Sequence, residues 1–194
     1  ANGTILTLKK IWGPFMQKNT LNSYAPLTRW IHWTMGVIII TLLTVGFIMT
    51  DMQDGDLKWT VYGVHKAVGL IVLATIGFRI IWRLMNPEPE LPKALPSWQK
   101  LASRINIRLL YVLMVVMPVS GFSMSYLGGY PIGFFGLFTI PPYGPKLEIA
   151  KGIAEIHETS GLILAYLVGL HVLAGLYHHL IRKDNVLLRM LGRG

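Results

Sequence analysis

Four stretches of the chain carry almost no charge and are each long enough to cross a lipid bilayer as a helix. They cover residues 26–50, 59–82, 105–127 and 149–182, each to within a few residues. A transmembrane helix needs about 20 mainly apolar residues, and each stretch meets that length. The pattern predicts an all-α integral membrane protein built as a bundle of four transmembrane helices.

The segments between these stretches are polar or rich in helix-breaking residues. Residues 51–58 form a short acidic loop, and residues 83–104 form a linker rich in proline and basic residues. Residues 128–155 hold so many glycines, prolines and aromatic residues that no separate span is expected there, although the fourth helix begins near Ile149. The apolar FFGLF at 134–138 is expected to lie in the membrane interface.

Lysine and arginine are concentrated before the first stretch, in the 83–104 linker and in the C-terminal tail. Cytoplasmic segments of membrane proteins carry this excess of positive charge, so both termini are expected in the cytoplasm. We divide the chain into an N-terminal arm, residues 1–23, and a transmembrane domain, residues 24–191. No removable signal peptide is expected, because no small-residue cleavage site follows the short apolar patch near the start.

The composition agrees with a membrane protein and excludes several kinds of site. Hydrophobic residues make up 53% of the 194 residues and charged residues only 14%, which is too apolar for an ordinary soluble domain. The net charge of +9 lies beside the apolar stretches, so no nucleic-acid partner is expected. The chain has no cysteine, which excludes disulfides, iron–sulfur clusters, cysteine-bound zinc and covalently attached haem.

Four of the six histidines lie inside the predicted spans, where ionisable side chains are rare and usually functional. The alternating direction of the helices places His32 and His171 toward the cytoplasmic side and His65 and His157 toward the outer side. His157 and His171 are separated by about 21 Å along one helix and leave it on nearly the same face. Each pair brings two imidazoles from different helices to one depth, as a six-coordinate haem with two histidine ligands requires.

A glycine follows each of these histidines four residues later. The four glycines are Gly36, Gly69, Gly161 and Gly175. Residues i and i+4 share a helix face, so a glycine there leaves a flat patch against which a porphyrin can lie. The alternative is that the histidines bond between helices and the glycines serve helix packing. Zinc fits less well, because four histidines at two depths cannot surround one tetrahedral ion.

Residues near the cytoplasmic ends of the spans are further candidates. Arg29, Arg79 and Arg83 are placed to pair with the propionates of the inner haem. His178 follows His171 by seven residues, so it shares that face nearer the cytoplasm and is a candidate quinone or proton-relay contact. The alternatives are that the arginines only anchor the helices and that His178 faces lipid headgroups.

The sequence around these residues resembles the bacterial cytochrome b561 family. The similar segments are IHW at 31–33, HKAVG at 65–69, PVSG at 118–121, IHETSG at 156–161, and GLHVLAGLYHH followed by KDNVLLRM at 169–190. The resemblance covers about residues 24–191. It implies a multi-pass bundle in the bacterial inner membrane with two haem b groups, ligated at the positions of His32, His65, His157 and His171.

The resemblance also implies two functions. Some family members oxidise superoxide and pass the electron to ubiquinone, which would make this chain a superoxide:ubiquinone oxidoreductase linking an outer donor to the quinone pool. Others are electron-transfer subunits without enzymatic activity of their own that dock a partner redox protein. A haem-free transporter or structural bundle is the third hypothesis. The expected partners are membrane lipid, quinone, and either a small anion such as superoxide or a periplasmic redox protein.

The charges expected on the outer side do not decide between these donors. An anionic donor needs a surface that attracts anions beside the outer haem. The candidate cations are Lys58, Lys66, Lys146 and Lys151, and the opposing acids are Asp51, Asp54, Asp56 and Glu148. This mixed balance leaves the donor open.

Overall fold

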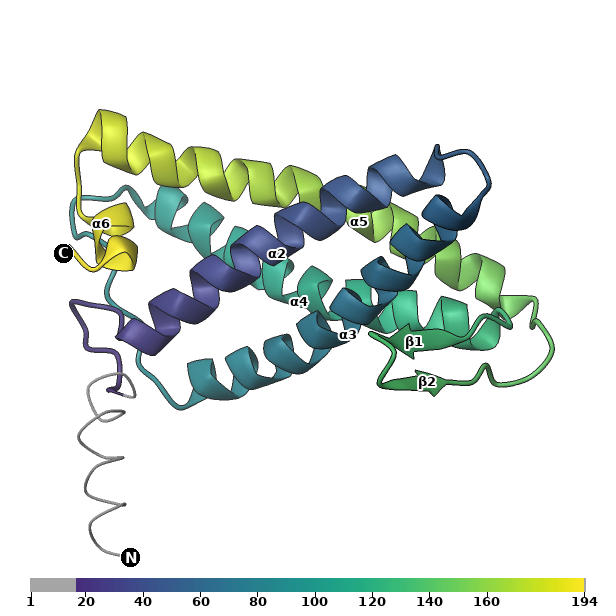
Figure 1. The fold of residues 1–194 in the computed structure, drawn as a ribbon. Coiled ribbons are helices and arrows are strands. Elements are labelled where there is room, and N and C mark those ends of the chain that lie inside the picture. Colours follow the sequence, from purple (N-terminus) through teal and green to yellow (C-terminus); the bar gives the residue numbers. More distant parts are fainter. Residues whose placement is uncertain (1–16, 194) are drawn as a thin grey trace, which may run out of the picture.

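The computed structural model describes residues 17–193, and within them four long helices form the bundle (Figure 1). The long helices are α2 (Pro26–Thr50), α3 (Asp56–Leu84), α4 (Ser97–Leu127) and α5 (Ile149–Tyr177). A π-helical turn, η1 (His178–Arg182), continues α5, and the short helix α6 (Val186–Leu191) follows a reversal of the chain. Each long helix is long and apolar enough to span a membrane, as predicted. Most of the arm predicted at 1–23 lies outside the described residues.

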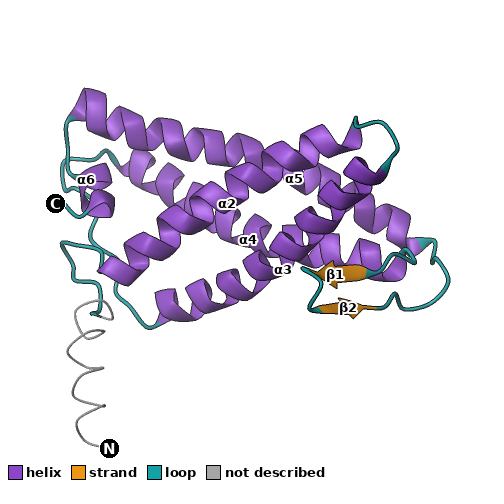
Figure 2. Ribbon diagram, in the orientation of Figure 1, coloured by secondary structure: helices purple, strands orange, loops and turns teal. Residues whose placement is uncertain are grey.

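The two ends of the bundle are built differently. A two-stranded antiparallel hairpin of β1 (Ile132–Phe134) and β2 (Phe138–Ile140) packs against α3 at one end (Figure 2). α6 lies across the opposite end, where both ends of the described chain are also found (Figure 1). We call these the hairpin end and the α6 end.

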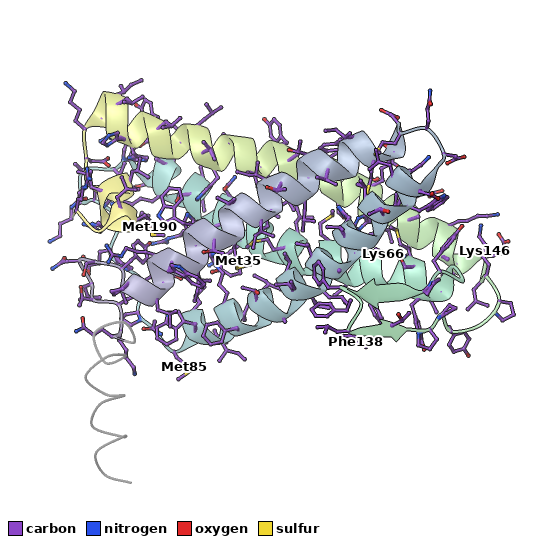
Figure 3. All side chains as sticks on the ribbon, in the orientation of Figure 1. Met35, Lys66, Met85, Phe138, Lys146 and Met190 are labelled. Atoms are coloured by element: carbon purple, nitrogen blue, oxygen red, sulfur yellow. The ribbon has the colours of Figure 1, made fainter. Side chains whose placement is uncertain are left out.

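The core is a layer of apolar side chains where the four helices meet. α4 packs most extensively against α5, and α2 packs against α3. Met35 and Ile76, each 1% exposed, lie at the centre of this layer, and Met35 is labelled in Figure 3. Large apolar side chains such as Phe78, Val112 and Leu173 are exposed on the outside of the helices. That exposure is expected when lipid rather than water surrounds a bundle.

The structure corrects one sequence-based boundary and gives a shape to one loop. α4 begins at Ser97 rather than near residue 105, because its first turns are polar and basic and extend beyond the apolar stretch. Hydropathy marks where a membrane span begins, not where its helix begins. The segment at 134–138, expected to lie in the membrane interface, forms the turn of the hairpin, with Phe135 and Gly136 at φ 48° and 77°. Its place in the interface stays a prediction.

Candidate functional site

Two histidine rings face each other toward the α6 end of the bundle. His32 on α2 and His171 on α5 have ring centres 6.0 Å apart, with their planes at 59°. A metal ion bound to one nitrogen of each ring at about 2.0–2.1 Å puts the ring centres about 6 Å apart. The observed separation therefore suits one metal centre between these two rings.

Arg79 on α3 lies beside this pair and forms no ion pair within residues 17–193. Its guanidinium donates to Nδ1 of His32 and to the hydroxyl of Tyr111, each at 3.1 Å. It also lies 3.8 Å from Sδ of Met35. A cation inside a membrane bundle is normally paired with an anion or with backbone carbonyls. Arg79 therefore has the chemistry to bind a carboxylate supplied by a ligand.

The second pair, His65 on α3 and His157 on α5, lies nearer the hairpin end. The two side chains are within electrostatic range of each other. Nδ1 of His65 is buried and has no hydrogen-bond partner within residues 17–193. Leaving a buried ring nitrogen unpaired is costly, so this atom marks a position where a polar or metal-bearing group fits.

Hydrogen bonds from α4 orient the ring of His157. Its Nδ1 lies 3.0 Å from the carbonyl oxygen of Met117 and 3.1 Å from Oγ of Ser120. A carbonyl only accepts, so we infer that Nδ1 donates to it and that the Nε2 lone pair is free. Histidines that ligate metals commonly donate their other nitrogen to a backbone carbonyl in this way.

Two glycines make room for the rings of the hairpin-end pair. A Cβ on Gly121 would lie 2.9 Å from Cε1 of His157, closer than real Cβ contacts allow. A Cβ on Gly46 would lie 3.5 Å from Cε1 of His65, in ordinary contact. Gly121 is therefore required where α4 passes the His157 ring.

The four glycines predicted to form flat patches fall into two groups. A Cβ on Gly36, Gly69 or Gly175 would meet no atom within 4 Å, so these three border open space. Gly161 faces α4 instead, where a Cβ would lie 3.5 Å from Cε of Met117. Three of the four positions thus border open space, and Gly161 is in ordinary contact with α4. Whether a porphyrin lies against any of them stays a prediction.

The residues present fit a haem at each histidine pair. Within residues 17–193 no group of three or more His, Asp or Glu side chains is placed to hold a metal ion. The facing rings of His32 and His171 suit an ion whose remaining ligands come from a macrocycle. At the other pair, the unpaired Nδ1 of His65 leaves a position for the same kind of group. An open apolar groove of about 410 Å³ between α2 and α5 also shows that these two helices do not close on each other over the span.

The other arginines at the α6 end differ in their contacts. Arg83 forms an ion pair with Glu88. Arg29 lies against Gly192, and its buried Nε has no partner within residues 17–193. Tyr24 lies near Glu88, just outside the spans. Its burial is the main cause that raises the pKa of its hydroxyl, and the negative charge of Glu88 is the second. Arg29 and Arg79 thus keep donors for a ligand, whereas Arg83 is engaged by the protein.

His178, the predicted quinone contact, lies where α5 becomes π-helical. Its Nδ1 is 2.7 Å from Oδ2 of Asp184, and the two side chains are 17% and 18% exposed. The neighbouring His179 is exposed. His178 is therefore the sheltered member of this histidine pair and the one with a fixed orientation.

Two of the lysines at the hairpin end are paired with acids. Lys58 contacts Asp54 at 3.0 Å, and Lys151 contacts Glu148 at 2.8 Å. Both pairs are local in sequence and leave at least one side chain exposed, so they contribute little stability.

The other two lysines at this end form no ion pair within residues 17–193. Lys66, next to His65 in the chain, donates to the carbonyl of Pro131 at 2.7 Å. Lys146 lies in the loop before α5. Figure 3 labels Lys66 and Lys146 at this end of the bundle.

Sequence reasoning missed three residues of these sites. Tyr111 contacts Arg79, and the Met117 carbonyl contacts His157, but no local pattern marks either residue. Asp184 does stand out in the sequence, because it is the single acidic residue after Glu158. An isolated acid next to a cluster of histidines and basic residues is worth testing as a partner for one of them.

Comparison with known proteins gives a consistent result. A family described as prokaryotic cytochrome b561 matches residues 23–193. The chain is 29% identical over 184 residues to cytochrome b561 homolog 2 of Escherichia coli (strain K12), covering 90% of this chain and 94% of that protein. It is 29% identical over 180 residues to cytochrome b561 homolog 1 of the same organism, covering 89% of this chain and 99% of that protein. It is 28% identical over 173 residues to a probable superoxide oxidase, CybB, of Yersinia pestis, covering 87% of this chain and 95% of that protein.

Proposed function

The chain belongs to the prokaryotic cytochrome b561 family, and on that premise we propose that it carries electrons across the bacterial inner membrane between an outer donor and the quinone pool. Family membership itself makes the chain a multi-pass membrane cytochrome that binds haem b and transfers electrons. Family membership does not give the number of haems, their ligands, the donor or the acceptor, and we propose these here.

The first part of the proposal is that each histidine pair holds one haem b. His32 and His171 bind the haem at the α6 end, and His65 and His157 bind the haem at the hairpin end. The observation that carries this assignment is the 6.0 Å separation of the His32 and His171 ring centres. A haem with two histidine ligands has no open coordination position, so when bound it exchanges single electrons.

Arg79 and Arg29 are assigned to the propionates of the haem at the α6 end. Arg79 donates to Nδ1 of His32, but ligation through Nε2 puts a proton on that Nδ1. The guanidinium then needs another acceptor, and a carboxylate is the charge-matched one. The buried, unpaired Nε of Arg29 is a second donor at this end.

The α6 end is proposed to face the cytoplasm, with the quinone exchanging electrons there near His178. The lysine- and arginine-rich segments meet at this end, which favours the cytoplasmic side. The donor then approaches the hairpin end, where Lys66 and Lys146 form no ion pair within residues 17–193. His178 exchanges protons with the quinone because imidazole can both give and take a proton near neutral pH.

Superoxide is the donor we propose, supported by the similarity to a probable superoxide oxidase. Two superoxide anions each lose one electron and leave as dioxygen. One quinone takes both electrons and two protons and leaves as quinol. Because superoxide is a small anion, unpaired lysines near the outer haem favour its approach.

The experiment is to purify the full chain with its haem and mix it with superoxide and a water-soluble ubiquinone analogue. The expected results are two haems per chain by pyridine haemochrome, low-spin spectra, and quinol formed at half the rate at which superoxide is lost. One haem per chain would contradict the paired sites. Haems that are reduced only by a co-purified redox protein would favour the alternative, an electron-transfer subunit without its own enzymatic activity.

A further inference from the structure

The end of α5 widens into a π-helical turn before the chain reverses. The N–H of Lys183 bonds to the carbonyl of His178, which closes the wide turn. Lys183 has φ 53°, in the left-handed region that residues other than glycine seldom adopt. The reversal brings Asp184 back against His178. Turns of this kind are frequent at functional sites.

The carboxylate of Asp184 is held by three contacts. Oδ2 accepts a hydrogen bond from Nδ1 of His178 at 2.7 Å and lies 3.7 Å from Nε of Arg182. Oδ1 accepts a hydrogen bond from the backbone N–H of Val186 at 3.1 Å, at the start of α6. Both side chains of the His178–Asp184 pair are mostly buried. The pair is therefore fixed and sheltered, unlike an ordinary surface ion pair.

This contact determines which ring nitrogen of His178 can exchange a proton. The carboxylate accepts, so Nδ1 keeps its hydrogen and donates it. Nε2 has no hydrogen-bond partner within residues 17–193 and is not among their buried, unpaired atoms, so it is reachable. In the neutral ring Nε2 carries a lone pair, and in the protonated ring it carries a hydrogen. Nε2 alone therefore gains and loses the proton.

We propose that Asp184 is a positioning residue that makes Nε2 of His178 the atom that delivers protons to the quinone. This inference rests on the proposed function, which places quinone exchange near His178. Asp184 does not touch the quinone. It holds the ring in one orientation and one tautomer, as a buried carboxylate does for a catalytic histidine.

Reduction of one quinone takes two electrons, which the proposed electron transfer would supply, and two protons, which reach it through His178. When Nε2–H gives its proton to a quinone oxygen, the ring becomes neutral and keeps its Nδ1–H on Asp184. A proton from water at the α6 end then returns to Nε2. The quinone leaves as quinol, and the His178–Asp184 pair is unchanged after each cycle.

Asp184 is the acidic side chain that contacts His178 within residues 17–193. The other charged or titratable side chains on the neighbouring turns of α5, η1 and α6 and their connection are His171, Tyr177, His179, Arg182, Lys183 and Arg189. The Tyr177 ring lies edge-on, 5.9 Å from the His178 ring, and Arg189 donates to the carbonyl of Glu90 at 2.6 Å. Asp184 is therefore the acidic side chain of these turns, and removing its charge leaves no carboxylate on them.

The test compares Asp184→Asn with the unchanged protein, both haem-loaded, by the rate at which decylubiquinone reoxidises the reduced haems. The amide nitrogen donates to Nδ1 of His178, so the neutral ring carries its proton on Nε2 instead. We expect reoxidation to slow about tenfold or more; a positioned proton-transfer group itself contributes about 10²–10⁴-fold, and Asp184 acts only through such a group. Haem content and spectra should not change.

Two further variants separate the inference from the proposed function. His179→Gln is the matched control and should leave the rate and its pH profile unchanged. His178→Gln should slow reoxidation as Asp184→Asn does, and the double variant should be no slower than either, because the two residues act as a unit. If His178→Gln has no effect, the proposed quinone site is wrong. If His178→Gln slows the reaction but Asp184→Asn does not, the quinone site stands and the role of Asp184 is overturned.

A measurement on the unchanged chain covers the case in which Asp184→Asn fails to fold. Nitrogen-15 NMR of histidine-labelled protein, with His178→Gln used to assign the signal, reports the tautomer of the neutral ring. The inference requires the proton on Nδ1. A neutral His178 with its proton on Nε2 would overturn it.

Discussion

At the residue scale, the histidines are positioned by glycines and carbonyls on other helices. The His157 ring lies against α4, where Gly121 gives it space and the Met117 carbonyl accepts its Nδ1–H. The glycine that contacts the ring thus comes from another helix, and Gly161, four residues after His157, faces Met117 instead. Ligand orientation here depends on contacts between helices rather than on spacing within one helix.

Replacing Gly121 with alanine should displace the His157 ring. The new Cβ would come within 2.9 Å of Cε1, and overpacking of this kind typically costs about 1–3 kcal/mol. Loss of the hairpin-end haem, with the other haem kept, is the expected outcome in a haem-content and thermal-unfolding assay. Gly77→Ala, at a helical glycine with nothing within 4 Å, is the matched control and should keep both haems.

Single ligand replacements should remove the haems one at a time. His65→Ala should abolish the low-spin spectrum of the hairpin-end haem and leave the other largely intact, and His171→Ala should do the reverse. The physical reason is that, in the proposed assignment, each haem has its own two histidines on different helices. Reduced-minus-oxidised spectra with haemochrome quantitation measure the outcome. A variant that keeps two low-spin haems would show that the pairs are wrongly assigned.

At the element scale, the hairpin carries backbone strain at its tip. Phe135 and Gly136 both have positive φ, and the N–H of Leu137 bonds to the carbonyl of Phe134 at 2.9 Å, which makes a type I′ turn. A bulky residue at positive φ is an outlier, whereas asparagine is favoured at this position. Phe135 is 54% exposed, so its side chain gains little from packing within the protein.

Phe135→Asn should therefore stabilise the hairpin by part of the roughly 1–2 kcal/mol that a non-glycine residue costs in the left-handed region, because asparagine adopts it more readily. A higher unfolding temperature in detergent, with unchanged haem spectra, is the expected result. Leu137→Asn is the control, because Leu137 is also exposed but is not one of the positive-φ residues. A lower unfolding temperature for Phe135→Asn would mean that Phe135 packs against α3 more strongly than its exposure suggests.

At the scale of the whole molecule, the charges divide between the two ends. The α6 end carries the basic linker and tail, and the hairpin end carries paired and unpaired lysines together with the acidic loop. The mean field at the hairpin end is therefore weak, so we expect individual lysines close to the proposed hairpin-end haem to decide the approach of an anion.

Lys66→Glu with Lys151→Glu should slow reduction of the haems by superoxide, most clearly at low ionic strength. The reason is that long-range steering is screened over about 10 Å at 0.1 M salt. Stopped-flow reduction at several salt concentrations measures the effect, and Lys146→Glu extends the test to the other unpaired lysine. Lys93→Glu, which changes an exposed lysine at the α6 end, is the control. Equal slowing by Lys93→Glu would show that only the net charge matters.

The sequence by itself determined the number, type and approximate place of the long helices. A span needs about 20 apolar residues in a row, which is a local property that hydropathy reports directly. The alternating direction of the spans then gave the depth pairing of the histidines, and the structure brings His32 close to His171 and His65 close to His157. Whether each pair binds a haem stays a prediction.

The tertiary structure decided everything that depends on two distant residues meeting or on one backbone angle. Gly121 against His157, Arg79 between His32 and Tyr111, and the hairpin turn at Phe135 carry no signature in hydropathy or spacing. Asp184 lies only six residues from His178, yet its contact requires the π-helical turn and the left-handed Lys183 that reverse the chain. Periodicity predicts which face of a helix a residue occupies, but only packing and local backbone geometry decide what that residue touches.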